Sequence, residues 1–199
     1  MKKVGFFAER VKPVIIMAAL TIICIAIVSG IHLSTQDLVI ANEGLFLKKA
    51  VLYAGGIKLP ETNAEINELY EERVAERGDI FEISGLSGDI AAYAFIIVGP
   101  GLWGEIEAVT AFTPDLASFV GVEFVKQNET PGLGARITEP WFKEQMRGKP
   151  FPLRMVPEGT AGASGEIDAI TGASRTSAYV LQIFNSAGEK AEKLRKEGI

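Results

Sequence analysis

Residues 13–36 contain no Asp, Glu, Lys or Arg, and they include the almost wholly apolar run PVIIMAALTIICIAIVSGI. A helix rises 1.5 Å per residue, so about 20 apolar residues cross a hydrocarbon core about 30 Å thick. The apolar part of a cleaved signal peptide is shorter, about 7 to 15 residues, and ends at a small-x-small cleavage site that is not evident here. We therefore predict a retained transmembrane helix over residues 13–36, rather than a signal peptide or a buried core helix.

The charges on either side of this run are unequal. Residues 1–12 carry four basic side chains and one acidic one, a net charge of +3, so the remainder must carry −8 to give the overall −5. Basic residues beside a membrane span favour the cytoplasmic side. We expect a single-pass protein of the cell (inner) membrane, with a cytoplasmic N-terminus at residues 1–12 and an extracytoplasmic or periplasmic C-terminal domain.

Composition excludes several classes of protein. One Cys and one His cannot form a structural zinc site, an iron–sulfur cluster or a disulfide framework, so no metal site is predicted. The net charge of −5 gives no basic surface for nucleic acid. Hydrophobic residues make up 48% of the chain, enough for a folded core. Any redox chemistry here needs an organic cofactor.

Beyond the span, the sequence predicts a helical connector over residues 37–78 and one domain over residues 79–199. Helical periodicity begins at Asp37 and stops at Gly55 and Gly56. A second helix begins at Asn63, with a docking face made of Ile66, Leu69, Tyr70 and Val74. Short β-rich runs separated by glycine predict an antiparallel sheet, and two further helices are expected to flank it. The expected strands are residues 81–83, 91–98, 105–110 and 120–126, the expected helices are 140–146 and 173–197, and the class is α+β.

Three glycine-rich segments punctuate the expected sheet: GPGLWG at residues 99–104, ETPGLG at 129–134 and DAITGAS at 168–174. Glycine lets backbone amides approach a ligand closely, and Trp103 adds a large flat ring. Each segment taken singly is also explained as a turn between strands. Together they predict a wall around a planar ligand.

The third segment precedes the last helix and is rich in hydroxyl side chains. Thr171, Ser174, Thr176 and Ser177 can cap the helix, or the free amides at its start can bind a phosphate, with Arg175 adding a cation. Neither G-x-x-x-x-G-K-[ST] nor G-x-G-x-x-G is present, so a P-loop or Rossmann site is not predicted. The residues alone therefore predict a membrane-tethered domain for a phosphate-bearing planar ligand.

The segment DAITGAS resembles the D-x-x-[ST]-G-A-[TS] signature of proteins that carry FMN covalently through a phosphoester. The order of features along the chain resembles that of the G subunit of Rnf-type electron transport complexes: one N-terminal membrane helix, then GLWG, ETPGLG and this signature. The homologous C subunit of the sodium-pumping NADH:quinone reductase has the same order. The resemblance implies an electron-carrier subunit of an ion-translocating ferredoxin:NAD oxidoreductase, with the NAD, ferredoxin and ion sites on other subunits.

The resemblance also assigns site residues. Ser174 becomes the attachment residue for FMN, where most family members have Thr, and Thr171 and Thr176 are the alternatives. Asp168 belongs to the signature read by the flavin transferase that installs FMN from FAD with magnesium, or it caps the helix. The expected cofactor-binding residues are Leu102, Trp103, Glu129, Thr130, Leu133 and Gly134 around the isoalloxazine ring, and Asp168, Thr171, Gly172, Ala173, Ser174 and Thr176 in the signature. Core packing is the alternative role for Trp103 and Leu133. No catalytic residue is expected.

The sequence is also compatible with two other functions. The C subunit of the sodium-pumping quinone reductase tends to be longer, so chain length favours the Rnf-type protein. A membrane-tethered binding or assembly module would also use glycine-rich loops, but it predicts no covalent flavin. If the chain is the Rnf-type protein, its partners are the other subunits of the complex and the flavin transferase.

Overall fold

The structure is a computed structural model that describes the backbone of residues 3–199 and the side chains of residues 9–199. Its contacts divide the chain into two units, one ending at Gly44 and the other comprising Leu45–Ile199. The expected basic segment 1–12 lies partly outside the described residues, since Lys2 precedes them.

The helix α1 (Lys3–Ala54) runs without a break through the apolar stretch, and Pro13 lies inside it. Within the described residues, it is the one helix long and apolar enough to cross a membrane, and an 18-residue stretch of it has a mean hydropathy of 2.9. The helical periodicity that begins at Asp37 belongs to this same helix. Gly55 and Gly56 follow its last residue, and Gly56 has the positive φ of +78° that ends helices readily.

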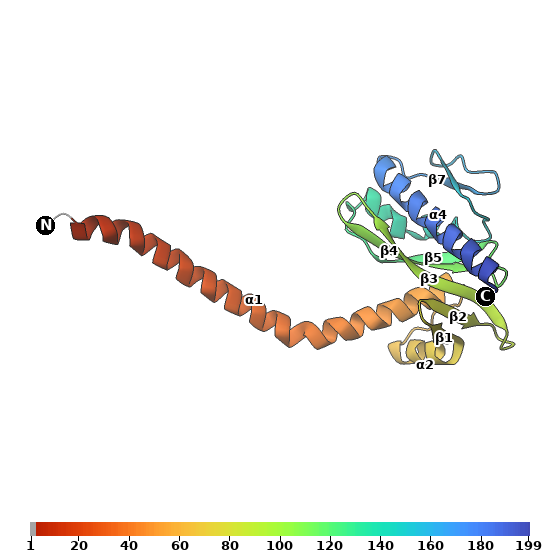
Figure 1. Ribbon diagram of the computed structural model, residues 1–199, viewed down its shortest axis with the longest axis horizontal. Coiled ribbons are helices and arrows are strands. Elements are labelled where there is room, and N and C mark those ends of the chain that lie inside the picture. Colours follow the sequence, from red (N-terminus) through yellow and green to blue (C-terminus); the bar gives the residue numbers. More distant parts are fainter. Residues whose placement is uncertain (1–2) are drawn as a thin grey trace. The chain divides into compact units, whose positions relative to one another are not determined.

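An antiparallel sheet with the strand order β1-β2-β3-β4-β5 forms the centre of the second unit (Figure 1). Its strands are β1 (Val74–Arg77), β2 (Ile80–Ser84), β3 (Ile90–Pro100), β4 (Glu105–Phe112) and β5 (Phe119–Lys126). The last four match the β-rich runs of the sequence. The α+β class with an antiparallel sheet and flanking helices is confirmed, and β1 is an additional edge strand.

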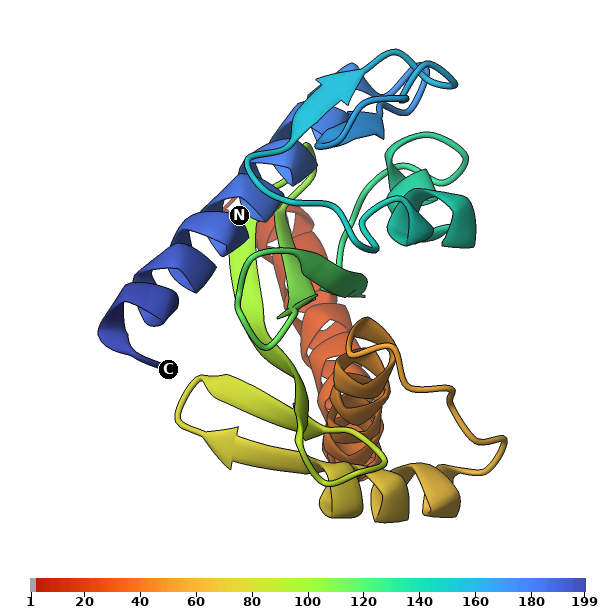
Figure 2. The same ribbon diagram turned by 90° about the vertical axis from the view of Figure 1, so that its right-hand side faces the viewer.

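Successive residues of a strand point to opposite faces, so the sheet separates two hydrophobic clusters. In β3, Tyr93 and Phe95 join one cluster, which also contains Val180, Ile183 and Phe184 of α4 (Ser174–Glu197). Ala92 and Ala94 join the other, together with Leu52 from the end of α1 and Tyr70 of α2 (Asn63–Arg73). Figure 2 shows α4, in blue, along one face of the strands. The domain therefore has helix layers on both faces of its sheet.

The short helix α2 begins at a capping box. The Thr62 hydroxyl accepts a hydrogen bond from the Glu65 amide, and the Glu65 carboxylate accepts one from the Thr62 amide, both at 3.3 Å. Ile66 and Tyr70 are buried, as their expected docking face requires. Val74 is the exception, because its backbone is extended and it begins β1 instead of continuing the helix.

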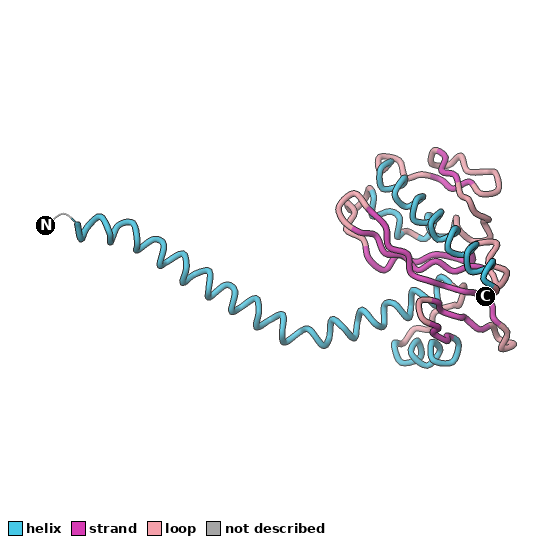
Figure 3. The backbone as a smooth tube through the Cα atoms, viewed as in Figure 1, coloured by secondary structure: helices cyan, strands magenta, loops and turns pink. Residues whose placement is uncertain are grey.

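The remaining elements lie between β5 and α4. They are η1 (Gly134–Thr138), α3 (Pro140–Glu144) and two strands of three residues, β6 (Arg154–Val156) and β7 (Glu166–Asp168), which pair in parallel. Figure 3 shows the loops that connect them, in pink. The sequence predicts α3 but not the β6–β7 pair. α4 ends at Glu197, and the Gly198 that caps it has the left-handed φ of +88°.

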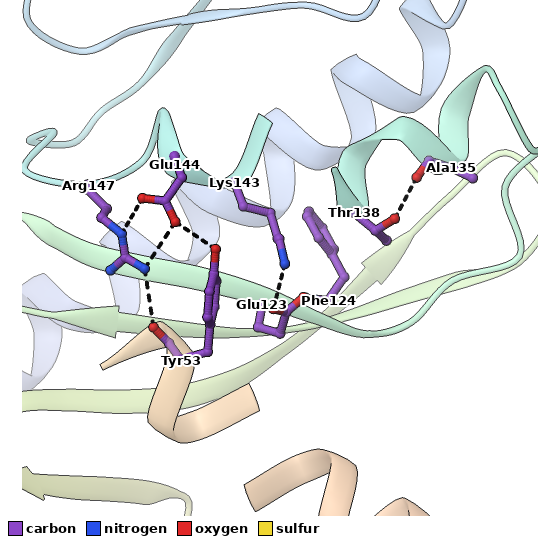
Figure 4. Close-up of polar contacts among 8 residues, drawn as sticks. All are labelled: Tyr53, Glu123, Phe124, Ala135, Thr138, Lys143, Glu144 and Arg147. Atoms are coloured by element: carbon purple, nitrogen blue, oxygen red, sulfur yellow. Dashed lines mark hydrogen bonds and ion pairs between the residues drawn. The ribbon is translucent and has the colours of Figure 1, made fainter. Parts of the chain in front are cut away.

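A polar cluster joins the last turn of α1 to the α3 region (Figure 4). Tyr53 Oη donates to Glu144 Oε1 at 2.6 Å, and Arg147 Nε donates to Glu144 Oε2 at 2.6 Å. Arg147 Nη1 also donates to the carbonyl oxygen of Val120 in β5 at 2.9 Å. These bonds attach the end of α1 and α3 to the same edge of the sheet, so residues 45–54 are part of the folded domain.

Candidate functional site

A cavity of about 270 Å³ opens where the three glycine-rich segments meet. The segments are the β3–β4 turn, the loop after β5 and the first turn of α4. The lining residues are Leu102, Glu129, Thr130, Leu133, Gly134, Gly172, Ala173, Ser174, Arg175 and Thr176. A larger hollow of about 520 Å³ lies along α2, but its wall consists largely of glutamates and contains none of the three segments. The cavity at α4 is therefore the candidate site.

The Glu129 carboxylate connects all three segments. Its Oε1 accepts hydrogen bonds from the Leu102 amide at 2.7 Å and from the Trp103 amide at 3.3 Å, both in the β3–β4 turn. Its Oε2 accepts a hydrogen bond from Thr176 Oγ1 in α4 at 2.5 Å. Glu129 is 5% exposed and Thr176 is 1% exposed, so these bonds are shielded from water. One buried side chain therefore fixes the relative positions of the cavity walls.

Two glycines are required for Glu129 to reach these partners. A Cβ at position 134 would lie 2.6 Å from both Glu129 Oε2 and Thr176 Oγ1, and a Cβ at position 101 would lie 2.7 Å from Glu129 Oε1. Real Cβ atoms do not approach oxygen so closely, because the contact is well inside van der Waals distance. Gly101 and Gly134 leave room for the carboxylate.

At the start of α4, Ala173 is the N-cap, and its side chain makes no capping hydrogen bond. The amides of the first turn have no carbonyl one turn earlier to accept from them, so they can bind an anion. Ser174 is exposed and lines the cavity. Ser177, which the sequence groups with the capping hydroxyls, instead accepts a hydrogen bond from the Ile170 amide at 3.0 Å.

The signature loop before α4 is held by two carboxylates. Asp168 Oδ1 accepts hydrogen bonds from the Thr160 amide at 2.9 Å and the Ala161 amide at 2.8 Å, which orders the preceding loop. Glu158 Oε2 accepts one from the Thr171 amide at 2.7 Å, while Glu158 Oε1 pairs with Arg136 Nη2 at 3.0 Å. The Thr171 amide first, and then Arg136, lower the pKa of Glu158 to about 2.

Most of the residues expected to bind the cofactor meet at this cavity, and three do not line it. Trp103 lies beside it and is 66% exposed, with its Nε1 donating to Thr130 Oγ1 at 3.1 Å. Asp168 is the last residue of β7, and Thr171 lies in the turn between β7 and α4. Arg175, which the sequence indicates only as an additional cation, does line the cavity. Glu158 is a supporting residue that sequence reasoning missed, since it belongs to no motif and acts from 13 residues before Thr171.

The cavity fits part of a phosphorylated planar ligand such as FMN. Leu102, Leu133 and Ala173 supply apolar surface, and the α4 amides with Arg175 supply donors and positive charge for a phosphate. Pockets that enclose small molecules usually measure about 300 to 1,000 Å³. The observed cavity is slightly smaller, so the remainder of an FMN would lie at its open mouth.

Comparisons with known proteins agree with this geometry. The FMN-binding domain family matches residues 101–189, which include all three segments around the cavity. The G subunit of the Na⁺-translocating ferredoxin:NAD⁺ oxidoreductase complex of Acetobacterium woodii is 30% identical over 169 residues, covering 83% of this chain and 79% of that protein. The G subunit of the ion-translocating oxidoreductase complex of Methanosarcina acetivorans is 26% identical over 188 residues, covering 90% and 93%.

The C subunits of another complex are also similar. The C subunit of the Na⁺-translocating NADH-quinone reductase of Neisseria meningitidis is 31% identical over 117 residues, covering 55% of this chain and 45% of that protein. The crystal structure of the C subunit from Parabacteroides distasonis superposes with a TM-score of 0.65 at 23% identity, covering 75% of this chain and 92% of that one. At that identity the superposition shows a shared fold. The apolar helix α1 and the ion-translocating complexes of the relatives together support a single membrane span.

Proposed function

Because the chain belongs to the FMN-binding family that includes the G subunits of Rnf-type complexes and the C subunits of Na⁺-translocating NADH-quinone reductases, we propose that it is an Rnf-type G subunit with FMN attached to Ser174. The family membership makes it an FMN-binding subunit of an ion-translocating oxidoreductase. The Rnf-type complex, the covalent bond, its position and the side of the membrane are the proposed parts.

We choose Ser174 as the attachment residue because of where the hydroxyls of Ser174, Thr176 and Thr171 lie. Ser174 is exposed at the first position of α4, beside the free amides of the first turn, and it lines the cavity. Thr176 is 1% exposed, and its hydroxyl donates to Glu129, so it is poorly placed to react. Thr171 is exposed but does not line the cavity, and its amide is held by Glu158. Of the three hydroxyls, that of Ser174 is therefore the one that is both exposed to solvent and located where a phosphate can bind.

The attachment reaction is a phosphoryl transfer catalysed by a separate flavin transferase. Ser174 Oγ gives up its proton to a base of the transferase and forms a bond to the phosphorus of the FMN half of FAD, while the pyrophosphate bond breaks and AMP leaves with the negative charge. The magnesium ion belongs to the transferase. In this chain, the α4 amides and Arg175 would hold the phosphate, while Asp168 and Glu158 keep the signature loop in one conformation.

Bound FMN supplies one-electron chemistry, and the protein supplies its position and electrostatic environment. Leu102 and Leu133 provide apolar contact surface in the cavity wall. The Glu129 hydrogen bonds hold that wall together. A phosphoester retains the flavin outside the cytoplasm, where a dissociated FMN could not readily be replaced. Donor and acceptor cofactors belong to other subunits of the complex.

Coverage of the relatives supports the Rnf-type assignment. The chain spans 79% and 93% of the two G subunits named above, but only 45% of the C subunit of Neisseria meningitidis. The test is to delete the gene and assay membranes for ferredoxin-dependent reduction of NAD⁺ and for NADH-dependent reduction of quinone. We expect the first activity to disappear. Loss of the second activity alone would assign the chain to a quinone reductase.

Covalent attachment is tested by producing the chain together with its transferase and separating it on a denaturing gel. We expect ultraviolet-excited fluorescence in the band and the mass of FMN on the peptide containing Ser174. Ser174→Ala should lose both, whereas the matched variant Thr171→Ala should keep them. A non-fluorescent wild-type band would refute the covalent attachment and favour a binding or assembly module. Fluorescence that persists in Ser174→Ala would move the attachment to Thr171 or Thr176.

Orientation in the membrane is proposed from the +3 charge of residues 1–12. Protease added to intact spheroplasts should digest the domain beyond Asp37, with a cytoplasmic protein as the control for leakage. Protection of the domain until the membrane is permeabilised would reverse the proposed orientation.

A further inference from the structure

The cavity wall contains a buried acid whose charge is not balanced by an ion pair. Glu129 takes part in none of the ion pairs found among residues 9–199, although other buried or half-buried acids such as Glu82 and Glu123 do. Its partners are the Leu102 and Trp103 amides and the Thr176 hydroxyl. Neutral donors stabilise a carboxylate through charge-assisted hydrogen bonds, but they do not cancel its net charge.

We propose that Glu129 is a positioning residue that also keeps the reduction potential of the bound FMN lower than a neutral side chain would. The inference rests on the proposed function, because it requires a flavin in this cavity. It assigns to Glu129 an electrostatic role in addition to closing the cavity wall.

The physical reason is the sign and burial of the charge. Reduction adds an electron to the flavin, and a nearby anion makes that added negative charge less favourable. Coulomb interactions are several times stronger at a shielded site than in water, because fewer solvent dipoles screen them. Glu129 is 5% exposed and lines the cavity, so its field reaches a ligand there with little screening.

Arg175 provides the opposite charge on the same cavity. It lines the cavity, and its Nη2 donates to Tyr179 Oη at 3.3 Å, one turn further along α4. Because Arg175 is exposed, solvent screens its field more than that of Glu129. The two residues should therefore shift the potential in opposite directions, with the larger effect from Glu129.

The experiment compares reduction potentials of the full-length, flavin-loaded protein. The hydrogen bonds from the Leu102 and Trp103 amides and the Thr176 hydroxyl to Glu129 form a clamp between the cavity walls. Glu129→Gln retains an oxygen that can accept from the two amides and an amide that can donate to Thr176 Oγ1, so it removes the charge while preserving the clamp. A spectroscopic titration with dithionite and redox mediators supplies the electrons and follows flavin absorbance. We expect the one-electron equilibrium to favour reduction by about tenfold more than in the wild type, which corresponds to a rise of about 59 mV.

Two control variants separate charge from structure. Thr176→Val removes one clamp hydrogen bond without changing the charge, and it should shift the potential much less. Glu105→Gln removes an exposed carboxylate at the start of β4 and should leave the potential unchanged. An unchanged potential in Glu129→Gln, or an equal rise in Thr176→Val, would overturn the inference.

If Glu129→Gln does not fold or does not carry flavin, Arg175→Gln tests the premise that charges lining this cavity act on the flavin, because Arg175 is exposed and does not hold the buried cavity wall together. We expect its potential to fall, and no change would overturn the inference. Failure of the proposed function would give a different result in the same experiment. In that case the wild-type protein itself carries no covalent flavin, whereas failure of the inference leaves a loaded protein with an unshifted potential.

Discussion

Tyr53 Oη donates to Glu144 Oε1 at 2.6 Å across a separation of 91 residues (Figure 4). Tyr53 also lies beneath two cations, with Lys143 Nζ 4.4 Å and the Arg147 guanidinium carbon 5.3 Å from its ring centroid. Partial burial first, and then the Glu144 hydrogen bond, raise the pKa of the Tyr53 hydroxyl. This contact holds the end of α1 against the α3 region.

Removing the Tyr53 hydroxyl should weaken the domain measurably. We expect Tyr53→Phe to lower the free energy of unfolding by about 1 kcal/mol, because the ring and its cation contacts remain while one charge-assisted hydrogen bond is lost. Arg147→Ala should cost about 2 kcal/mol, since it also leaves the Val120 carbonyl without this donor. Urea unfolding followed by circular dichroism measures both. Tyr179→Phe, which changes a long 3.3 Å contact, is the control and should be near neutral.

The last turns of α1 should be needed for the folded domain. Ala50, Val51, Leu52 and Ala54 are at most 1% exposed and pack in the cluster beneath the sheet. We expect a fragment starting at Leu45 to unfold cooperatively on heating. A fragment starting at Ile57 exposes this face and should lose several kcal/mol, because burial of each large apolar side chain contributes about 1.5 to 3 kcal/mol. Equal melting temperatures for the two fragments would contradict this packing.

Local sequence patterns predict the parts of the fold that local physics determines. Strands β2 to β5 are long enough to show β-branched and aromatic runs between glycines, so they could be recognised. β1 could not, because its four residues follow a helix directly and include Glu76 and Arg77. β6 and β7 have three residues each, and their parallel pairing depends on tertiary contacts.

In the candidate site, too, the parts made of contiguous sequence could be predicted and the parts made by tertiary contacts could not. Its three segments could be found because each is a contiguous glycine-rich motif. The role of Thr176 could not be predicted, since a hydroxyl in a first helical turn suggests capping, whereas this one donates to Glu129 across 47 residues. Glu158 was missed for a similar reason. Its importance depends on the Thr171 amide and Arg136, which only the folded chain brings to it.

Glu158 should make the stability of the signature loop depend on acid. Its pKa of about 2 in the folded state lies below the ordinary 4.5, so its contribution is full above about pH 4.5 and is lost as the pH falls towards 2. We expect Glu158→Gln to be less stable than the wild type at pH 7, and the difference should shrink as the pH falls from 4.5 to 2.

Unfolding curves at a series of pH values measure this difference, with the exposed Glu61→Gln as the control. A difference between Glu158→Gln and the wild type that stays constant, or grows, down to pH 2 would contradict the assignment.

Gly134→Ala should separate the cavity walls. Its Cβ would lie 2.6 Å from both Glu129 Oε2 and Thr176 Oγ1, so the shortest hydrogen bond of the clamp must lengthen or break. Overpacking a tight site usually costs about 1 to 3 kcal/mol, and we expect a loss of that size in the free energy of unfolding together with reduced FMN fluorescence per protein.

Gly162→Ala is the matched control for this substitution. Position 162 has no heavy atom within 4 Å of an added Cβ, so this variant should stay within about 0.5 kcal/mol of the wild type and keep its flavin. If Gly134→Ala kept full stability and flavin content, the α4 turn and the Glu129 loop would have to move apart without consequence. A clamp made of one buried carboxylate and three donors does not allow that, because each displaced donor would be left without its acceptor in a site shielded from water.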